Sequence, residues 1–237
     1  MTSSVAQTSR LPARDVTVLV LSGSRRSGSL NTRLARLAVH HLNETGVDVT
    51  MTTLAEFDVP GYDQDVEDSS GIPEGAVRLR QLLESVDAFI LVSPEYNASV
   101  PGGLKNLIDW VSRYQPQPFH MRHGLMMSAS PSMVGGNRGL WALRVPLEHL
   151  GARIYPDMFS LARAHEAFDD AGQLVDPALA HFFRSTLDGF SDLVEASKHY
   201  PRVKTAWIEF LGEPHTDATA RIDTPPPLAA ARAEAQR

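Results

Sequence analysis

Five short runs of strand-like sequence, mostly continuous apolar stretches but alternating apolar and polar in Val47–Thr52, are interspersed with helical patterns along this chain. This succession constrains the fold more than any other feature of the sequence. The runs, each of strand length, are Val16–Leu21, Val47–Thr52, Asp87–Ser93, Gly124–Ser130 and Ala152–Leu161. Apolar residues at helical spacing follow each of them, in Leu30 to about Glu44, Glu74–Ser85, Leu104–Arg113, Leu140–Leu150 and Pro177–Lys198. The pattern predicts a doubly wound α/β domain with a five-stranded parallel sheet, right-handed crossovers and helices on both faces.

Three of the loops that follow predicted strands have unusual compositions. They are Ser22–Thr32, rich in Gly, Ser and Arg; Pro94–Gly103, with prolines near both ends; and Ser130–Gly136, built of small residues. All three follow the carboxyl ends of parallel strands, where doubly wound sheets bind ligands at the point of strand-order reversal. We therefore expect a ligand site at this edge of the sheet.

The loop Ser22–Thr32 leads from a strand into a helix and directs backbone N–H groups and small hydroxyls toward a positive helix end, which suits a phosphate. It lacks the lysine of a Walker loop and the three spaced glycines of a dinucleotide fingerprint, so a single terminal phosphate fits better. Arg25 or Arg26 could add positive charge there. The alternative is a serine-rich turn in which Ser29 only caps the helix.

Composition restricts the classes of function. A net charge of -6 and a pI near 5.8 argue against nucleic-acid or anionic-membrane partners, and the absence of cysteine excludes disulfides and thiolate chemistry. His40-His41-x-x-Glu44 and His120-x-x-His123 fall short of the three or four convergent ligands of a metal site, so none is predicted. With no 18-residue apolar run and no apolar core of a signal peptide, we expect a cytoplasmic protein.

The chain divides into three predicted regions. Residues 1–14 are expected to form a flexible leader, residues 15–200 the α/β domain, and residues 201–237 a C-terminal extension that is partly disordered. The Pro-, Ala- and Thr-rich composition of the last residues is typical of segments that lack a packed core.

Three sequence blocks resemble the NADPH-dependent FMN reductases with a flavodoxin-like fold, a group that includes quinone, azo-dye and chromate reductases. The blocks are Gly23-Ser24-Arg25-x-Ser27-x-Ser29-x-Asn31, Pro94-Glu95-Tyr96-Asn97-x-Ser99-x-Pro101-Gly102-x-Leu104-Lys105-Asn106-x-Ile108-Asp109-Trp110, and Gly135-Gly136. The second block is the most specific, and the likeness spans about Val16 to Lys198. It implies strand order 2-1-3-4-5, bound FMN, NADPH or NADH as electron donor, and a homodimer or homotetramer.

Carried over by position, the resemblance implies cofactor-binding residues on all three loops. The FMN phosphate is expected to contact Ser24, Arg25, Ser29 and Asn31, with Thr32 as a further candidate. The ribityl chain and ring edge are expected to contact Pro94, Glu95, Tyr96 and Asn97, mainly through backbone groups, with Glu95 orienting its loop by accepting N–H bonds. Ser130 and Ser132 are expected near the ring or ribityl chain, and Gly135 and Gly136 allow close backbone approach. No catalytic side chain is assigned, because a flavin supplies the hydride chemistry.

The predicted function is that of an enzyme, an FMN-dependent NAD(P)H oxidoreductase that reduces quinone, azo, metal-oxyanion or free-flavin acceptors by ping-pong turnover. The alternative is a flavodoxin-like electron carrier or flavin-binding sensor that docks a protein partner. Trp110, Arg113 and Tyr114, with the long polar segment Asp58–Pro73, are expected to form a subunit contact. In the opposing interpretation Trp110 lies in the core of a monomer.

Overall fold

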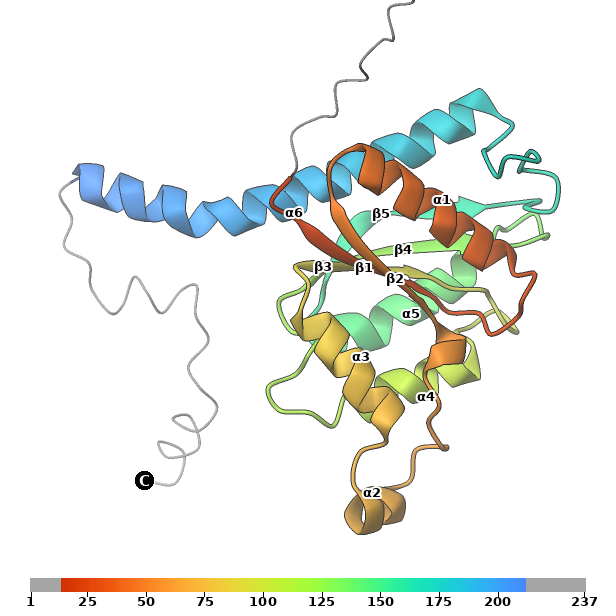
Figure 1. The fold of residues 1–237 in the computed structure, drawn as a ribbon, viewed down its shortest axis with the longest axis horizontal. Coiled ribbons are helices and arrows are strands. Elements are labelled where there is room, and N and C mark those ends of the chain that lie inside the picture. The colour runs from red at the N-terminus through yellow and green to blue at the C-terminus, as the bar shows by residue number, and fades with distance from the viewer. Residues whose placement is uncertain (1–13, 212–237) are drawn as a thin grey trace, which may run out of the picture. The chain divides into compact units, whose positions relative to one another are not determined.

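The five predicted strands form one parallel sheet in the order β2-β1-β3-β4-β5 (Figure 1), which confirms the predicted flavodoxin-like topology. The computed structural model describes residues 14–211, with side chains described as far as residue 200. The strands are β1 (Thr17–Ser22), β2 (Asp48–Thr53), β3 (Ala88–Val92), β4 (His123–Ala129) and β5 (Arg153–Leu161). The strand ends differ from the predicted ones by one residue at most, within the usual uncertainty of element boundaries.

Helices connect the strands in the predicted alternation. They are α1 (Leu30–Glu44), the 3-10 helix η1 (Leu54–Glu56), α2 (Gln64–Ser70), α3 (Glu74–Glu84), α4 (Gly102–Val111), α5 (Asn137–His149) and α6 (Pro177–Leu211). The chain divides into two units, one through Asp192 and one from Leu193 on. Helix α6 runs past the predicted end at Lys198, so that prediction was too short. Almost all of the predicted leader, and the extension beyond residue 211, lie outside the described residues.

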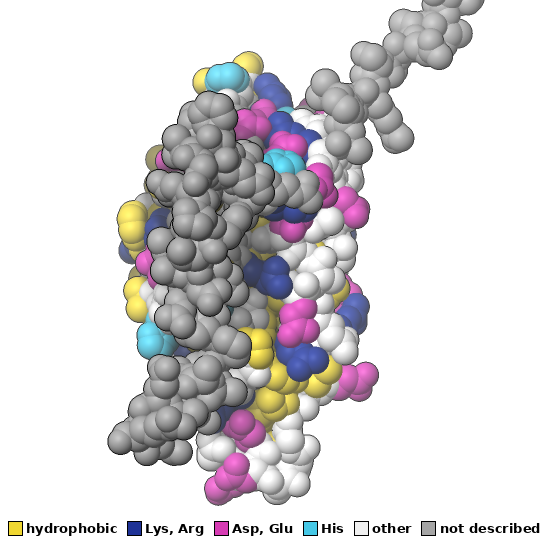
Figure 2. Space-filling view, turned by 90° about the vertical axis from the view of Figure 1, so that its left-hand side faces the viewer, with side chains coloured by type: hydrophobic (Ala, Val, Ile, Leu, Met, Phe, Trp, Pro, Cys, Tyr) yellow, Lys and Arg dark blue, Asp and Glu magenta, His cyan; other side chains and the backbone are white. Residues whose placement is uncertain are grey.

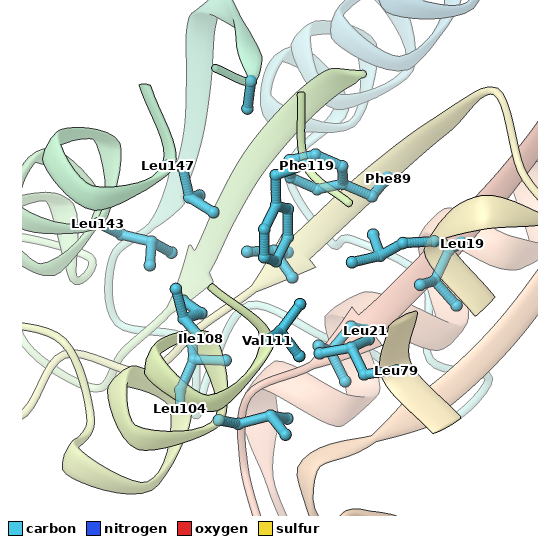
Figure 3. Packing of buried hydrophobic residues seen from close by; sticks show 14 of the residues in the cluster. Leu19, Leu21, Leu79, Phe89, Leu104, Ile108, Val111, Phe119, Leu143 and Leu147 are labelled. Carbon is cyan, nitrogen blue, oxygen red and sulfur yellow. The ribbon is translucent and has the colours of Figure 1, made fainter. Parts of the chain in front are cut away.

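The face of the sheet covered by α3, α4 and α5 carries a large cluster of buried hydrophobic residues (Figures 1 and 3). Leu21 and Phe89 project from β1 and β3 into side chains of these helices, and the Phe89 ring meets Phe119 edge to face at 5.6 Å. Fully burying one such side chain contributes about 1.5–3 kcal/mol, so the helices are held by their apolar stripes. This packing fixes where α4 and α5 begin relative to the sheet edge.

The opposite face is covered by α1 and by the first part of α6 (Figure 1). Helix α1 buries Leu34, Ala38 and Leu42, which lie on one face at i, i+4 and i+8. Phe159 of β5 packs edge to face on Phe183 of α6, with ring centroids 5.1 Å apart. Because α1 crosses this face directly from the end of β1, its first turn lies at the carboxyl edge of the sheet.

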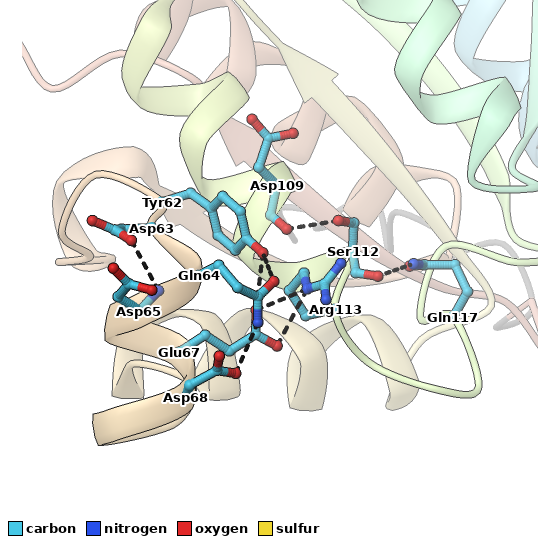
Figure 4. Close-up of polar contacts among 10 residues, drawn as sticks. All are labelled: Tyr62, Asp63, Gln64, Asp65, Glu67, Asp68, Asp109, Ser112, Arg113 and Gln117. Carbon is cyan, nitrogen blue, oxygen red and sulfur yellow. Dashed lines mark hydrogen bonds and ion pairs between the residues drawn. The ribbon is translucent and has the colours of Figure 1, made fainter.

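The long polar segment Asp58–Pro73 contains the short helix α2, which the sequence prediction missed. Asp63 caps this helix by accepting the N–H of Asp65 at 2.9 Å. Glu67 then reaches Arg113 at the end of α4, with Oε2 2.9 Å from Nε (Figure 4). The segment is thus ordered, and its ion pair with Arg113 holds it against the same domain.

Trp110 lies in the core, and the prediction that it forms a subunit contact was wrong. Its side chain is 0% exposed, and its indole N–H donates to the carbonyl oxygen of Pro60 at 2.8 Å. Asn106 donates to the same oxygen at 2.8 Å, and the ring of Tyr62 meets the indole edge to face at 5.0 Å. Asn106 and Trp110 of α4 therefore hold the segment Asp58–Pro73 of the same chain in place.

Acidic and basic side chains are interspersed on the face shown in Figure 2, so neither sign of charge covers the part of it that is in view. Within the described part of the chain, no helix combines the length and the apolar character needed to cross a bilayer.

Candidate functional site

The loops after β1, β3 and β4 converge on one pocket beyond the carboxyl edge of the sheet, as the sequence predicted. The pocket has a volume of about 170 Å³ and is lined by Ser24, Arg26, Ser29, Leu30, Asn31, Pro94, Glu95, Tyr96, Ala129, Ser130 and Pro131. Backbone hydrogen bonds between neighbouring strand ends fix the bases of the three loops. The N–H groups of Gly23, Ser93 and Ser130 donate to the carbonyls of Val92, Met127 and Leu161 at 2.9, 2.9 and 3.0 Å.

The first turn of α1 forms one end of this pocket and has donors to offer. Ser29 is the N-cap, and its hydroxyl accepts the N–H of Thr32 at 3.4 Å. The N–H groups of Leu30 and Asn31 have no acceptor among the described residues, as is usual for the first residues of a helix. Free N–H groups at a positive helix end, beside the hydroxyls of Ser24 and Ser29, suit an anion such as a phosphate.

The two adjacent arginines of the first loop point to different places. Arg25 donates from Nη2 to the carbonyl oxygen of Phe57 at 3.0 Å and lies 4.0 Å from the carboxylate of Asp58. It does not line the pocket, whereas Arg26 does. The sequence raised both residues as sources of positive charge and selected Arg25; the geometry favours Arg26.

Asn31 lines the pocket, but its side chain has a structural task. Its Nδ2 donates to the carbonyl oxygen of Ala129 and its Oδ1 accepts the N–H of Ala129, both at 2.9 Å. This pair of buried bonds joins the start of α1 to the end of β4. Thr32 likewise turns inward, where its hydroxyl bonds the hydroxyl of Ser22 at 2.8 Å, and it does not line the pocket.

A tight turn after β3 places Tyr96 at the pocket. The backbones of Tyr96 and Ser99 exchange two hydrogen bonds of 3.0 Å, and the central residues Asn97 and Ala98 have φ values of 51° and 60°. Left-handed backbone at a non-glycine residue is strained, by about 1–2 kcal/mol for Ala, and such strain is concentrated at functional sites. Tyr96 is 52% exposed, while Asn97 does not line the pocket.

Glu95 accepts three hydrogen bonds from α5, in keeping with the expectation that it accepts N–H bonds to orient its loop. Its Oε1 accepts from Nε and Nη2 of Arg138 at 3.0 and 2.7 Å, and its Oε2 accepts the N–H of Gly139 at 3.1 Å. Burial by itself would raise the pKa of the Glu95 carboxyl, but the bonds from Arg138 and Gly139 and the charge of Arg138 outweigh it. The pKa therefore lies below its ordinary value, and Glu95 is a carboxylate at neutral pH.

The glycines after β4 have a reason within the fold itself. Gly136 has a φ of 84°, and a Cβ there would lie 2.0 Å from the hydroxyl oxygen of Ser128. A Cβ on Gly135, at φ 64°, would lie 3.0 Å from backbone atoms of Ser160 and Ala162. Both glycines let this loop lie directly on β4 and β5, and neither lines the pocket.

Ser130 lines the pocket, and Ser132 supports it. The hydroxyl of Ser130 donates to the hydroxyl of Ser132 at 3.0 Å and accepts the N–H of Ser132 at 3.2 Å. Of the predicted residues, Ser24, Ser29, Asn31, Pro94, Glu95, Tyr96 and Ser130 line the pocket. Arg25, Thr32, Asn97, Ser132, Gly135 and Gly136 do not.

The histidines of the first cluster pair with acidic side chains. His40 lies 3.3 Å from Glu44 one turn along α1, and His41 Nε2 lies 2.8 Å from the carboxylate of Asp188 on α6. Across residues 14–200, no three or more His, Asp or Glu side chains are grouped so as to hold a metal ion.

Comparison with known proteins identifies the relatives of this chain. The model of the NADPH-dependent FMN reductase family matches residues 16–166. A quinone reductase of Escherichia coli K12 is 32% identical over 184 residues, which cover 76% of this chain and 96% of that protein. An NAD(P)H-dependent FMN reductase of Pseudomonas aeruginosa is 34% identical over 163 residues, which cover 68% and 86%.

A solved structure agrees with these relatives. FerB, a flavoenzyme NAD(P)H:(acceptor) oxidoreductase from Paracoccus denitrificans, matches with a TM-score of 0.65 at 29% sequence identity. The match covers 76% of this chain and 97% of FerB.

Proposed function

Because the chain belongs to the NADPH-dependent FMN reductase family, we propose that it passes a hydride from NAD(P)H by way of FMN to a quinone, in two half-reactions that use one site in turn. Membership makes the protein an oxidoreductase that uses FMN and a nicotinamide electron donor. The observation that carries the proposal is the convergence of three loops on one pocket beside the open start of α1. Bound FMN supplies the hydride chemistry, so the residues have to bind and orient.

The residues at the start of α1 fit the phosphate of FMN. The N–H groups of Leu30 and Asn31, the hydroxyls of Ser24 and Ser29, and the guanidinium of Arg26 form a donor set that has no carboxylate in it. A phosphate accepts hydrogen bonds only, and a guanidinium adds a charge-assisted contact. In this proposal Asn31 acts through its backbone, since its side chain holds β4, and Arg25 ties the loop to Phe57 at the end of η1.

The loops after β3 and β4 would hold the rest of the cofactor. Pro94, Glu95 and Tyr96 line the pocket from the loop after β3, and Ala129, Ser130 and Pro131 line it from the end of β4 and the loop that follows. Tyr96 offers a half-exposed aromatic face on which a planar acceptor can stack. Two relatives that bear the name quinone reductase or quinone oxidoreductase support a quinone over azo, metal-oxyanion or free-flavin acceptors.

We retain the remaining expectations as part of this proposal. The protein acts in the cytoplasm on small molecules, with no nucleic acid or membrane as a partner, in keeping with its net charge of -6. A homodimer or homotetramer also stays a prediction, although Trp110 no longer supports it. Residues 1–14 as a leader and 201–237 as an extension remain predictions as well.

Kinetics of the purified protein test the reaction. Protein loaded with FMN should bleach anaerobically on addition of NADPH and recover its colour on addition of a quinone, without any partner protein. Initial rates at several fixed quinone concentrations should give parallel double-reciprocal lines, as expected when the two substrates use one site in turn. Intersecting lines would refute the alternating half-reactions, and a requirement for a partner protein would favour the electron-carrier alternative.

A matched pair of variants tests the phosphate site. Arg26→Ala removes a charge-assisted contact and should weaken FMN binding by about 1.5–3 kcal/mol, or one to two decades in the dissociation constant. Arg25→Ala removes the same charge from the adjacent residue, whose side chain is directed at the carbonyl oxygen of Phe57, so it should weaken binding less. Fluorescence titration with FMN measures both. If Arg25→Ala proves the more damaging of the two, the assignment of Arg26 is wrong.

A further inference from the structure

Glu95 places a buried negative charge at the wall of the pocket, and the proposed function gives that charge no role. Its side chain is only 9% exposed, and it lines the pocket proposed for FMN. A buried carboxylate must be compensated, and a flavin gains negative charge on reduction. An uncompensated carboxylate at this wall would therefore oppose reduction of the bound cofactor.

The compensation comes from α5. Arg138 forms two bonds with one carboxylate oxygen, and the N–H of Gly139 donates to the other. The N-cap of α5 is Gly136, which has no side chain with which to cap the helix, so Glu95 supplies the cap from another loop. The carboxylate thus meets both a full positive charge and the positive end of a helix.

The backbone of the turn after β3 also lies close to the backbone of α5 at this contact. A Cβ on Gly139 would lie 3.1 Å from Cα and Cβ of Glu95 and 3.1 Å from the carbonyl oxygen of Ser99. The turn that carries Tyr96 therefore lies directly against the first turn of α5. Any weakening of the Glu95–Arg138 pair acts on the wall of the pocket, although Arg138 does not line it.

We propose that Arg138 is a positioning residue that holds the turn after β3 against α5 and cancels the charge of Glu95, and that it thereby sets the reduction potential of bound FMN. The proposal rests on the proposed function, because it requires FMN in this pocket. It assigns Arg138 no contact with the cofactor. The pair is a charge-neutral support, in contrast to the first turn of α1, whose N–H groups stay free for an anion.

Midpoint potentials of FMN-loaded variants, measured against reference dyes, test the proposal by sign. Glu95→Gln should raise the potential, since a glutamine still accepts the N–H of Gly139 but carries no charge. Arg138→Met should lower it by exposing the cofactor to an uncompensated carboxylate. The double variant should return toward wild type. Arg144→Met is the control: this arginine lies on the same helix but pairs with Glu148, at 2.9 Å, so its loss should leave the potential close to wild type.

Two further measurements keep the test decisive. If Arg138→Met retains no FMN, the double variant with Glu95→Gln should restore binding, because the uncompensated negative charge of Glu95 has been removed. In the FMN-free protein, NMR of the side-chain carboxyl should show a higher pKa for Glu95 in Arg138→Met than in wild type.

Equal or same-direction shifts in the two single variants would overturn the proposal, and so would a double variant that fails to recover either potential or binding. Those results would leave Arg138 as a purely structural contact. Wild-type protein that binds no FMN would instead overturn the proposed function, and this inference with it.

Discussion

Replacing Trp110 with Phe should lower the free energy of unfolding by about 2–3 kcal/mol. The indole is fully buried, so the smaller ring leaves a void, and large-to-small changes of this kind cost about 1–2 kcal/mol. The lost N–H bond to Pro60 costs about 1 kcal/mol more, and not the full penalty of an orphaned acceptor, because Asn106 still donates to that oxygen. For a domain of this size, the thermal midpoint should fall by roughly 5–10 °C.

Urea unfolding followed by far-UV circular dichroism measures the effect without relying on tryptophan emission. Trp141→Phe is the matched control, because the same chemical change at a side chain that is 57% exposed should stay within about 0.5 kcal/mol. Light scattering on both variants separates core from interface. If Trp110→Phe alters the molecular mass while its unfolding free energy equals that of Trp141→Phe, the core assignment is refuted.

Three further substitutions probe the site's supports. Gly136→Ala should lower the free energy of unfolding by about 3 kcal/mol, because the backbone there has a left-handed φ and the new Cβ would lie 2.0 Å from a buried hydroxyl. Gly28→Ala is the control and should be tolerated, because a Cβ at Gly28 would have no atom within 4 Å. Equal melting temperatures of the two variants would contradict this prediction. Asn31→Ala orphans two buried backbone groups at the end of β4 and should lower unfolding free energy by about 2–4 kcal/mol in urea. Because the pKa of Glu95 is lowered in the folded state, wild type should be more stable than Glu95→Gln above pH 4.5, the ordinary pKa of a glutamate. This advantage in unfolding free energy should shrink as the pH falls through the lowered pKa of the folded state. An advantage that does not depend on pH would refute the prediction.

Much of the fold could be predicted from the sequence because it depends on local patterns. Apolar runs of strand length and helical stripes identified all five strands and the helices that cover them, and the alternation required a parallel sheet. Parallel strands place their following loops at one edge, so the convergence of the three loops on a pocket was also predictable. The prediction failed first at α2, where a polar, acidic segment gives no apolar stripe to recognise.

The roles of individual side chains depended on contacts between distant parts of the chain. Arg25 and Arg26 are neighbours in sequence, and only the position of the Phe57 carbonyl decides which of them turns away from the pocket. The sequence shows Trp110 on a helix but not the oxygen of Pro60 that receives its N–H.

Gly136 shows the same division between sequence and structure. The sequence marks a position that needs a glycine, and only the strand beneath it reveals that a Cβ there would meet the hydroxyl of Ser128. Periodicity along the chain determines which elements form and where their ends meet. Packing across the sheet decides which partner each polar group at that edge of the sheet bonds to. Short-range sequence patterns therefore do not predict these partners.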